Sequence, residues 1–199
     1  FEDKLKAIAA SKPQILQNIS GWAKGHGLNK VRAQQTGGES SMMYGVAKYL
    51  ILDTIKKAIG LDQCMMFFYG AAPLKQSSID YFASLDIPLK NMYGLSETTG
   101  SSTVNFMNDF SLNHAGMTAA GCHIKISNPN EEGKGEIKIK GRHVMMGYLK
   151  NDEATKSTID AQGFVRSGDK GKIEKDGHLK ITGRIKELII GAGGENVAP

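Results

Sequence analysis

The sequence is short of cysteine and of long apolar runs, and both absences exclude classes of protein. Its 199 residues include 2 cysteines, too few for a disulfide-stapled secreted scaffold. Cys64 lies in Gln63-Cys-Met-Met-Phe-Phe68, where we interpret it as a small buried residue of a strand. No apolar run approaches the roughly 20 residues that span a bilayer. Together these features favour a reducing, cytoplasmic setting.

The histidines and basic residues also lack the groupings that would mark metal or nucleic-acid sites. The five histidines stand singly, without metal-ligand spacing. The basic residues alternate with acidic ones and form no nucleic-acid module, so we expect no nucleic-acid partner. The formal net charge of +5 favours anionic ligands and leaves peripheral association with an intracellular membrane open. The sequence alone indicates no oligomeric state.

Residues 1–113 have the pattern of an α/β piece. A helical period runs from Phe1 to Trp22, with Pro13 as a kink or restart and Gly25–Gly27 as its end. Residues 28–40 are polar and indicate an exposed connection. Ser40 or Ser41 is expected to cap a second helix that Gly60 stops. The remaining predictions here are that helix at 43–59, a strand at 64–69, a helix at 75–85 and a short strand at 87–89.

Beyond residue 113 the apolar segments shorten and alternate with polar residues, as in antiparallel strands. The turn Lys175-Asp-Gly177 predicts a hairpin. Strands are expected at 121–126, 135–140, 171–174 and 178–181, with a short helix at 152–159. The fold class is therefore α/β, a sheet flanked by helices and followed by a small antiparallel, barrel-like subdomain.

One polar stretch, Asn91-Met-Tyr-Gly-Leu-Ser-Glu-Thr-Thr-Gly100, carries side chains suited to a nucleotide. We interpret it as a turn at the end of the 87–89 strand, the edge where α/β folds bind ligands. Tyr93 suits stacking on a base, and Glu97 suits a hard cation such as Mg²⁺. The hydroxyls of Ser96, Thr98 and Thr99 suit phosphate oxygens. Taken alone, such a stretch is as often an ordinary polar turn.

Four further motifs accompany this stretch in a fixed order. They are Tyr69-Gly-Ala-Ala-Pro-Leu74, Gly147-Tyr-Leu149 with Ala154-Thr155, Gly163-Phe-Val-Arg-Ser-Gly-Asp-Lys-Gly171, and Ile181-Thr-Gly-Arg-Ile-Lys-Glu-Leu-Ile-Ile190. The series resembles the adenylate-forming acyl-CoA synthetase superfamily. Phe68–Pro73 and Gly191–Pro199 resemble the bubblegum-type long-chain fatty-acid CoA ligases in particular.

The resemblance implies an enzyme that uses ATP and Mg²⁺ to convert a fatty acid to an acyl-adenylate and then transfers the acyl group to CoA. It implies an AMP-binding domain with an α/β subdomain at 1–113 and a β-rich subdomain at 114–183, and residues 184–199 as a hinge and the start of a C-terminal domain. By the same resemblance Ser96, Glu97 and the hinge Lys186 are the catalytic residues, and Glu97 is the metal ligand. The implied nucleotide-binding residues are Gly70, Ala71, Ala72, Tyr93, Gly94, Leu95, Ser96, Glu97, Thr98, Asp169 and Arg184.

The sequence also departs from the family pattern. Phe164 stands where the family often has Trp, and neither the Lys-containing phosphate loop nor the C-terminal catalytic Lys occurs in these residues. Because the chain begins at Phe1 and ends at Pro199 within a motif, we expect a fragment that is inactive by itself. Two alternatives stay open: another adenylate-forming enzyme, such as an aryl-CoA ligase or a luciferase-like oxygenase, and a non-catalytic scaffold that retains the fold.

Overall fold

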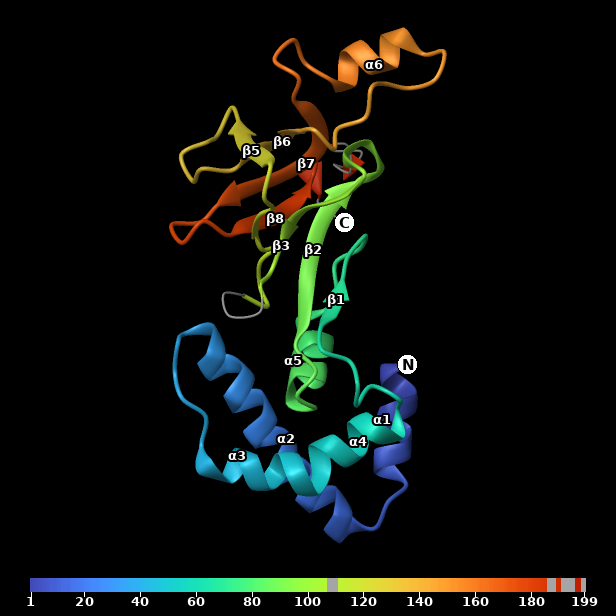
Figure 1. Ribbon diagram of the computed structural model, residues 1–199, viewed down its shortest axis with the longest axis vertical. Helices are drawn as coiled ribbons and strands as arrows, with labels where there is room; N and C mark the ends of the chain where they lie inside the picture. The colour runs from blue at the N-terminus through green and yellow to red at the C-terminus, as the bar shows by residue number, and fades with distance from the viewer. Residues whose placement is uncertain (107–110, 186–188, 191–195, 198–199) are drawn as a thin grey trace. The chain divides into compact units, whose positions relative to one another are not determined.

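The structure, a computed structural model, describes residues 1–106, 111–185, 189–190 and 196–197 (Figure 1). The chain forms two compact units. Unit 1 comprises Phe1–Leu89 and Met107–Leu112, and unit 2 comprises Lys90–Phe106 and Asn113–Pro199. The assignment of the chain to named subdomains stays a prediction.

Unit 1 is mainly helical. Its elements are α1 (Glu2–Ala10), α2 (Gln14–Gln35), α3 (Met42–Ala47), the π-helical turn η1 (Lys48–Leu52), α4 (Asp53–Ala58), the short strand β1 (Phe67–Tyr69) and α5 (Gln76–Ser84). Buried residues of α2 and α5, Val31, Ile79 and Ala83, pack with Leu112 into one core cluster. A second cluster joins Ala23 of α2 to Ala47 and Leu52.

Helix α2 corrects the prediction that Gly25–Gly27 ends a helix. Pro13 does restart the chain as the residue before α2, but the helix continues through both glycines to Gln35. A Cβ at Gly27 would lie 2.3 Å from the carbonyl oxygen of Ser84, at the end of α5. The glycine therefore permits close helix packing, and residues 28–35 are helix rather than an exposed connection.

Residues 42–58 form one continuous helical segment, close to the predicted 43–59. The Ser41 hydroxyl accepts a hydrogen bond from the Met43 N–H at 3.3 Å, which confirms the predicted cap. Gly60 has φ +72° and ends the segment, as expected. The prediction for Cys64 was wrong: this residue is exposed and precedes β1, because the strand is only three residues long.

A buried ion cluster that the sequence did not reveal ties the helices of unit 1 together. Asp86 is 7% exposed and accepts from Lys30 Nζ at 3.0 Å and from Lys56 Nζ at 2.9 Å. Burial alone would raise the pKa of Asp86, but the two lysines outweigh it and lower this pKa. The carboxylate therefore links α2 to α4 in its ionised form.

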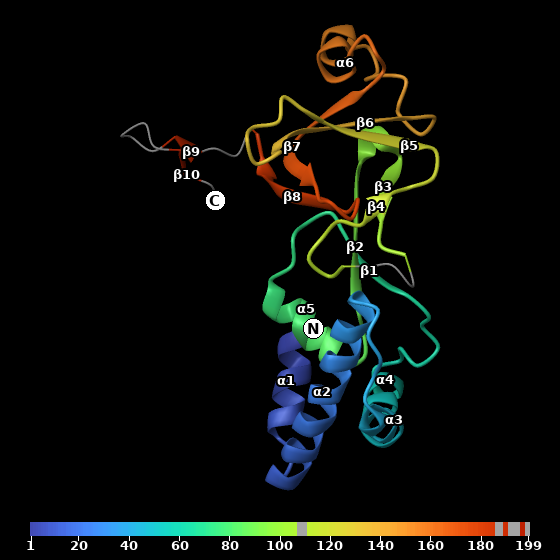
Figure 2. The ribbon, with the colours of Figure 1, turned by 90° about the vertical axis from the view of Figure 1, so that its left-hand side faces the viewer.

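The described residues of unit 2 form two larger antiparallel sheets and one two-stranded pair (Figures 1 and 2). In the first, β2 (Leu89–Leu95), β3 (Gly100–Val104) and β4 (Met117–Thr118) are neighbours in that order. In the second, the order is β5 (Cys122–Ser127), β6 (Gly135–Gly141), β7 (Val165–Ile173) and β8 (Leu179–Arg184). The unit also has α6 (Asp152–Thr158), and β9 (Ile189–Ile190) pairs with β10 (Asn196–Val197).

The α/β class is confirmed, but the barrel-like description needs correction. Among the described residues β5 and β8 are the edges of an open four-stranded sheet, so the barrel is not closed. The predicted Asp-Gly hairpin joins β7 to β8, with a 2.9 Å hydrogen bond from the Glu174 N–H to the His178 carbonyl. Asn151 caps α6 through the Ala154 N–H, within one residue of the predicted bounds.

The core of unit 2 lies between its two sheets. It contains Tyr93 of β2, Ile137 and Ile139 of β6, and Leu179 of β8, with Ala115 beside them. The alternation of buried and more exposed positions along β6 places one face of the second sheet against this core. None of the helices in the described ranges combines the length and the apolar character that crossing a membrane requires.

We predict opposite effects for two glycines of α2. Gly27→Ala should destabilise the protein by about 1–3 kcal/mol, since the new methyl group overlaps the Ser84 carbonyl. Gly21→Ala is the matched control, because a Cβ there meets nothing within 4 Å. It should be neutral or stabilising by up to about 1 kcal/mol. Thermal unfolding of both variants tests this, and equal shifts would contradict the packing argument.

Candidate functional site

The stretch Asn91–Gly100 is a strand, a tight turn and the start of a second strand, rather than only a turn after a strand at 87–89. Strand β2 runs to Leu95, a 3₁₀ turn η2 (Ser96–Thr98) follows, and β3 returns antiparallel from Gly100. The ladder shifts register between Tyr93 and Gly94. A Cβ at Gly94 would lie 1.7 Å from the Gly100 carbonyl oxygen, so close strand approach requires glycine there.

The buried Thr98 side chain stabilises the turn through its hydroxyl group. Thr98 is fully buried, and its hydroxyl accepts from the Leu95 N–H at 3.0 Å. The same hydroxyl lies 3.1 Å from the carbonyl oxygens of Leu95 and Gly100. Thr99 has φ +53° and donates to the His143 carbonyl at 2.7 Å. In this conformation both threonines fix the turn. Ser96 and Thr99 are both exposed, and the Thr99 hydroxyl is already engaged by the His143 carbonyl.

A buried tyrosine and aspartate join β2 to β7. The Tyr93 hydroxyl donates to Asp169 Oδ2 at 2.7 Å, although the two residues are 76 positions apart. Tyr93 is 8% exposed and Asp169 is 5% exposed. Burial, reinforced by the neighbouring carboxylate, raises the pKa of Tyr93 well above its usual range. The phenol therefore stays protonated and serves as a donor to Asp169.

Arg184 completes this cluster from the adjacent strand. Asp169 and Arg184 are directly paired in the β7–β8 ladder, and Arg184 Nε donates to Asp169 Oδ1 at 3.2 Å. The Ser167 hydroxyl accepts from the Asp169 N–H at 3.0 Å and donates to the Ile137 carbonyl at 2.6 Å. The Arg184 side chain is 58% exposed, so the cluster reaches from the core to solvent.

The second acidic group of the site, Glu97, contacts a different tyrosine. Tyr148 Oη donates to Glu97 Oε1 at 2.6 Å, and the Met145 N–H donates to the Glu97 carbonyl at 2.8 Å. The hydrogen bond to the carboxylate raises the pKa of Tyr148. The loop around Gly147 thus holds the η2 turn at both its side chain and its backbone.

Glu97 fits one kind of metal site and not another. No three His, Cys, Asp or Glu side chains gather as a metal cluster in the part of the chain that the structure describes. Mg²⁺, however, is commonly bound by one or two carboxylates together with substrate phosphate oxygens. Oε1 of Glu97 is engaged by Tyr148, which leaves Oε2 as the oxygen suited to a cation.

The other predicted site residues lie in other places. Gly70, Ala71 and Ala72 belong to unit 1, follow β1 directly and are exposed. Ala71 has φ +66°, a conformation that favours glycine. Lys186 and the loop 191–194 lie outside the described residues. The fold thus brings Tyr93, Asp169 and Arg184 together, while Glu97 lies at the η2 turn.

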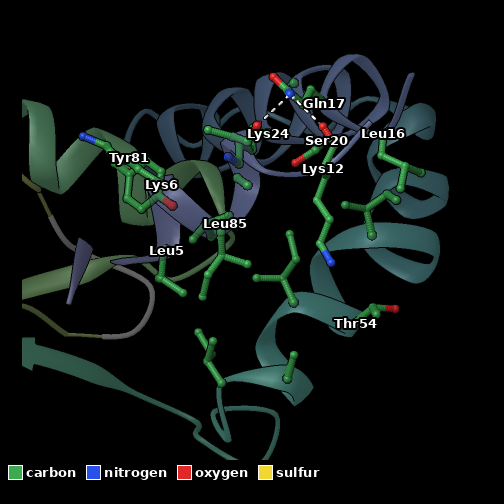
Figure 3. A pocket seen from close by; sticks show the side chains of 18 of the residues that line it. Leu5, Lys6, Lys12, Leu16, Gln17, Ser20, Lys24, Thr54, Tyr81 and Leu85 are labelled. Atoms are coloured by element: carbon green, nitrogen blue, oxygen red, sulfur yellow. Dashed lines mark hydrogen bonds between the residues drawn. The ribbon is translucent and has the colours of Figure 1, made fainter. Parts of the chain in front are cut away.

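Unit 1 also has an apolar cavity of about 790 Å³ between its helices (Figure 3). Leu5 of α1, Leu16 of α2 and Leu85 after α5 are among its lining residues. Gln17 closes the α1–α2 turn beside it with hydrogen bonds to the carbonyls of Ala10 and Lys12. No predicted site residue lines this cavity, and we assign it no part in the site.

Comparison with known proteins identifies the family. The sequence model of the family described as AMP-binding enzyme matches residues 8–149 of this chain. The chain belongs to this family. It is 45% identical to long-chain-fatty-acid–CoA ligase ACSBG2 of Gallus gallus and 42% identical to that of Xenopus laevis, over 100% of the chain in both. It spans 26% and 27% of these two relatives, about a quarter of their length.

Solved structures of adenylate-forming enzymes share the fold. One is the O-succinylbenzoate coenzyme A synthetase of Bacillus subtilis in complex with ATP and magnesium ion. It has a TM-score of 0.56 and 28% sequence identity to this chain, and the match covers 66% of this chain and 29% of the synthetase chain. Membership of the AMP-binding family and this shared fold agree with the α/β class described above.

Two contacts of the site were not predicted from the sequence. Tyr148 lies in the quoted motif Gly147-Tyr-Leu149, but its bond to Glu97 spans 51 positions and no local pattern indicates it. Ser167 lies in the quoted motif with Asp169, and its role as a support for the aspartate N–H was also missed. A polar residue two positions before the aspartate on the same strand face was the available signal.

We predict that Tyr93 and Asp169 are energetically coupled. Tyr93→Phe and Asp169→Asn should each destabilise the protein, because each leaves a buried polar partner short of a hydrogen bond. The double variant should cost less than the sum, with a coupling of about 1.5–3 kcal/mol. The matched control is Tyr148→Phe combined with Asp169→Asn, for which the losses in unfolding free energy of the two single variants should add. Urea unfolding of the unsubstituted protein and the five variants measures these effects, and additivity of the Tyr93 pair would contradict the contact.

Proposed function

We propose that the chain is part of a long-chain fatty acid–CoA ligase, an AMP-forming acid–thiol ligase. The observation that carries this proposal is the convergence of Tyr93, Asp169 and Arg184 in one cluster that opens to solvent at the arginine. The names of the two relatives support the choice of long-chain fatty acid as the substrate. ATP, CoA and the fatty acid are the proposed small-molecule partners.

The reaction has two steps. The fatty acid carboxylate attacks the α-phosphorus of ATP, and pyrophosphate leaves as the acyl-adenylate forms. The CoA thiol then attacks the acyl carbon, and AMP leaves as the thioester forms. A free carboxylate resists nucleophilic attack because of its charge and resonance. The enzyme therefore has to position the reactants and neutralise charge at the phosphate.

Asp169 and Arg184 are suited to the ribose side of the nucleotide. Tyr93 donates to one oxygen of Asp169 and Arg184 to the other, while a carboxylate has about four acceptor sites, so each oxygen is suited to accept from a ribose hydroxyl as well. The exposed Arg184 guanidinium suits the nearby phosphate. Tyr93 is assigned a positioning role through Asp169, and stacking of its ring on adenine stays a prediction.

Glu97, Ser96 and the η2 turn are suited to the phosphate side. The exposed Ser96 hydroxyl suits a bond to the α-phosphate, and Oε2 of Glu97 suits Mg²⁺. The cation would supply charge neutralisation at the phosphates. Gly94 and Leu95, which lead into the turn, are proposed to border the acyl group. Thr98 acts through the turn, since its hydroxyl is committed to the backbone.

The rest of the proposed site comes from the family resemblance. Gly70, Ala71 and Ala72 would contact adenine, and Lys186 would be the hinge of a C-terminal domain. We keep residues 1–113 and 114–183 as the two proposed subdomains of the AMP-binding domain, and 184–199 as the start of the next domain. The family match covers residues 8–149 and carries no boundary between subdomains, so this division stays a proposal.

We predict that two carboxylates are required for adenylation in the full-length protein. Asp169→Ala and Glu97→Gln should each slow fatty-acid-dependent pyrophosphate release by the equivalent of about 2–4 kcal/mol in barrier. Glu153→Gln, on the exposed side of α6, is the matched control and should be silent. Unchanged pyrophosphate release in both site variants, with the fold intact, would refute the assignment.

A panel of acyl chains tests the substrate class separately. The full-length protein should release pyrophosphate faster with long-chain fatty acids than with short-chain or aryl acids. Preference for an aryl acid would point to another member of the adenylate-forming enzymes. If none of the acids in the panel supported pyrophosphate release, the protein would lack the proposed activity.

A further inference from the structure

The second sheet of unit 2 has two faces of opposite character. Along β7, Asp169 points to the core and its neighbour Lys170 points away from it, as strand alternation requires. The ladder then places other cations on the same outer face as Lys170. We name as the basic face the six residues Lys125, Lys140, Arg166, Lys170, Lys172 and Lys180.

Cations oppose cations directly across this sheet. Lys125 is paired with Lys138, Lys138 with Arg166, and Lys172 with Lys180. Like charges opposite each other destabilise a sheet. Contacts within the fold offset part of this repulsion: Lys125 Nζ lies 3.9 Å from the centre of the Phe164 ring and donates to Gln162 Oε1 at 2.8 Å.

Carboxylates offset part of the positive charge on this outer face of the sheet. Asp160 lies 3.2 Å from Lys138, and Glu174 lies 3.0 Å from Lys172. Glu136 is the acidic residue at an outer strand position and is paired with Lys170 in the ladder. Within the described ranges no ion pair joins Arg166, Lys170 or Lys180 to a carboxylate, and all three are exposed.

We propose that the basic face is a docking surface for a lipid bilayer that carries anionic headgroups. Its cations are spread over four neighbouring strands, about 4.8 Å apart, which makes a broad surface rather than a groove. A broad cationic surface complements a planar array of phosphate and carboxylate groups, and each basic residue near such a membrane strengthens its binding. The choice of a lipid surface rests on the proposed function, since a long-chain fatty acid partitions into bilayers.

Docking by this face is compatible with access to the proposed site. The site residues Asp169 and Arg184 are on the opposite face of the same two strands. A bilayer on the basic face would therefore not cover the carboxylate. The proposal assigns no catalytic role to any of the six residues.

The test is co-sedimentation of the full-length protein with vesicles of phosphatidylcholine alone and of phosphatidylcholine containing phosphatidylserine. Binding should require phosphatidylserine and weaken as salt is raised. The triple variant Arg166→Glu, Lys170→Glu, Lys180→Glu should bind these vesicles at least about a hundredfold more weakly. A milder triple to Gln should show a smaller loss, which guards against a charge-reversed variant that fails to fold.

The matched control is Lys4→Glu, Lys57→Glu, Lys156→Glu, which changes the net charge equally at exposed positions elsewhere. It should bind nearly as well as the unsubstituted protein. Equal losses in the two triples, no binding to phosphatidylserine vesicles, or selective binding of RNA in their place would each overturn the proposal. Pyrophosphate release from detergent-dispersed fatty acid needs no vesicle, so failure of the proposed function and failure of docking are distinguishable.

Discussion

The pairing of Asp169 with Arg184 across β7 and β8 is the contact on which the arrangement of unit 2 depends. It fixes which side chains of these strands face the core. A shift of one residue would turn Asp169 outward and bring Lys170 against Tyr93. The buried hydrogen bond from Tyr93 penalises such a shift, because it would leave the phenol without its acceptor. The same contacts therefore fix both the register of the sheet and the geometry of the site.

Local patterns predicted the elements whose causes are local. The Asp-Gly hairpin, the cap at Ser41 and helix α6 follow from turn chemistry and periodicity within a few residues. The continuation of α2 through Gly27 was missed because its cause is the distant Ser84 carbonyl. Cys64 was misplaced for a related reason: an apolar run does not show where pairing begins, and β1 starts three residues later.

The same distinction between local and distant causes applies to the candidate site. The sequence supplied the residue types, since a phenol, two carboxylates and a guanidinium stand in motifs that resemble a known family. It did not supply their partners. Tyr148 holds Glu97 and Tyr93 holds Asp169 through contacts between strands and loops far apart in the chain. The ring of Tyr93, expected to meet a base, packs mainly into the core.

The crowding at Gly94 bears on how motifs of this kind are compared between proteins. Its missing side chain is demanded by the Gly100 carbonyl, before any ligand is considered. A descendant that had lost all chemistry would still have to keep this glycine in order to close the β2–β3 hairpin. The glycine is therefore a marker of ancestry and architecture, and inheritance of activity has to be judged from the acidic and basic groups around it.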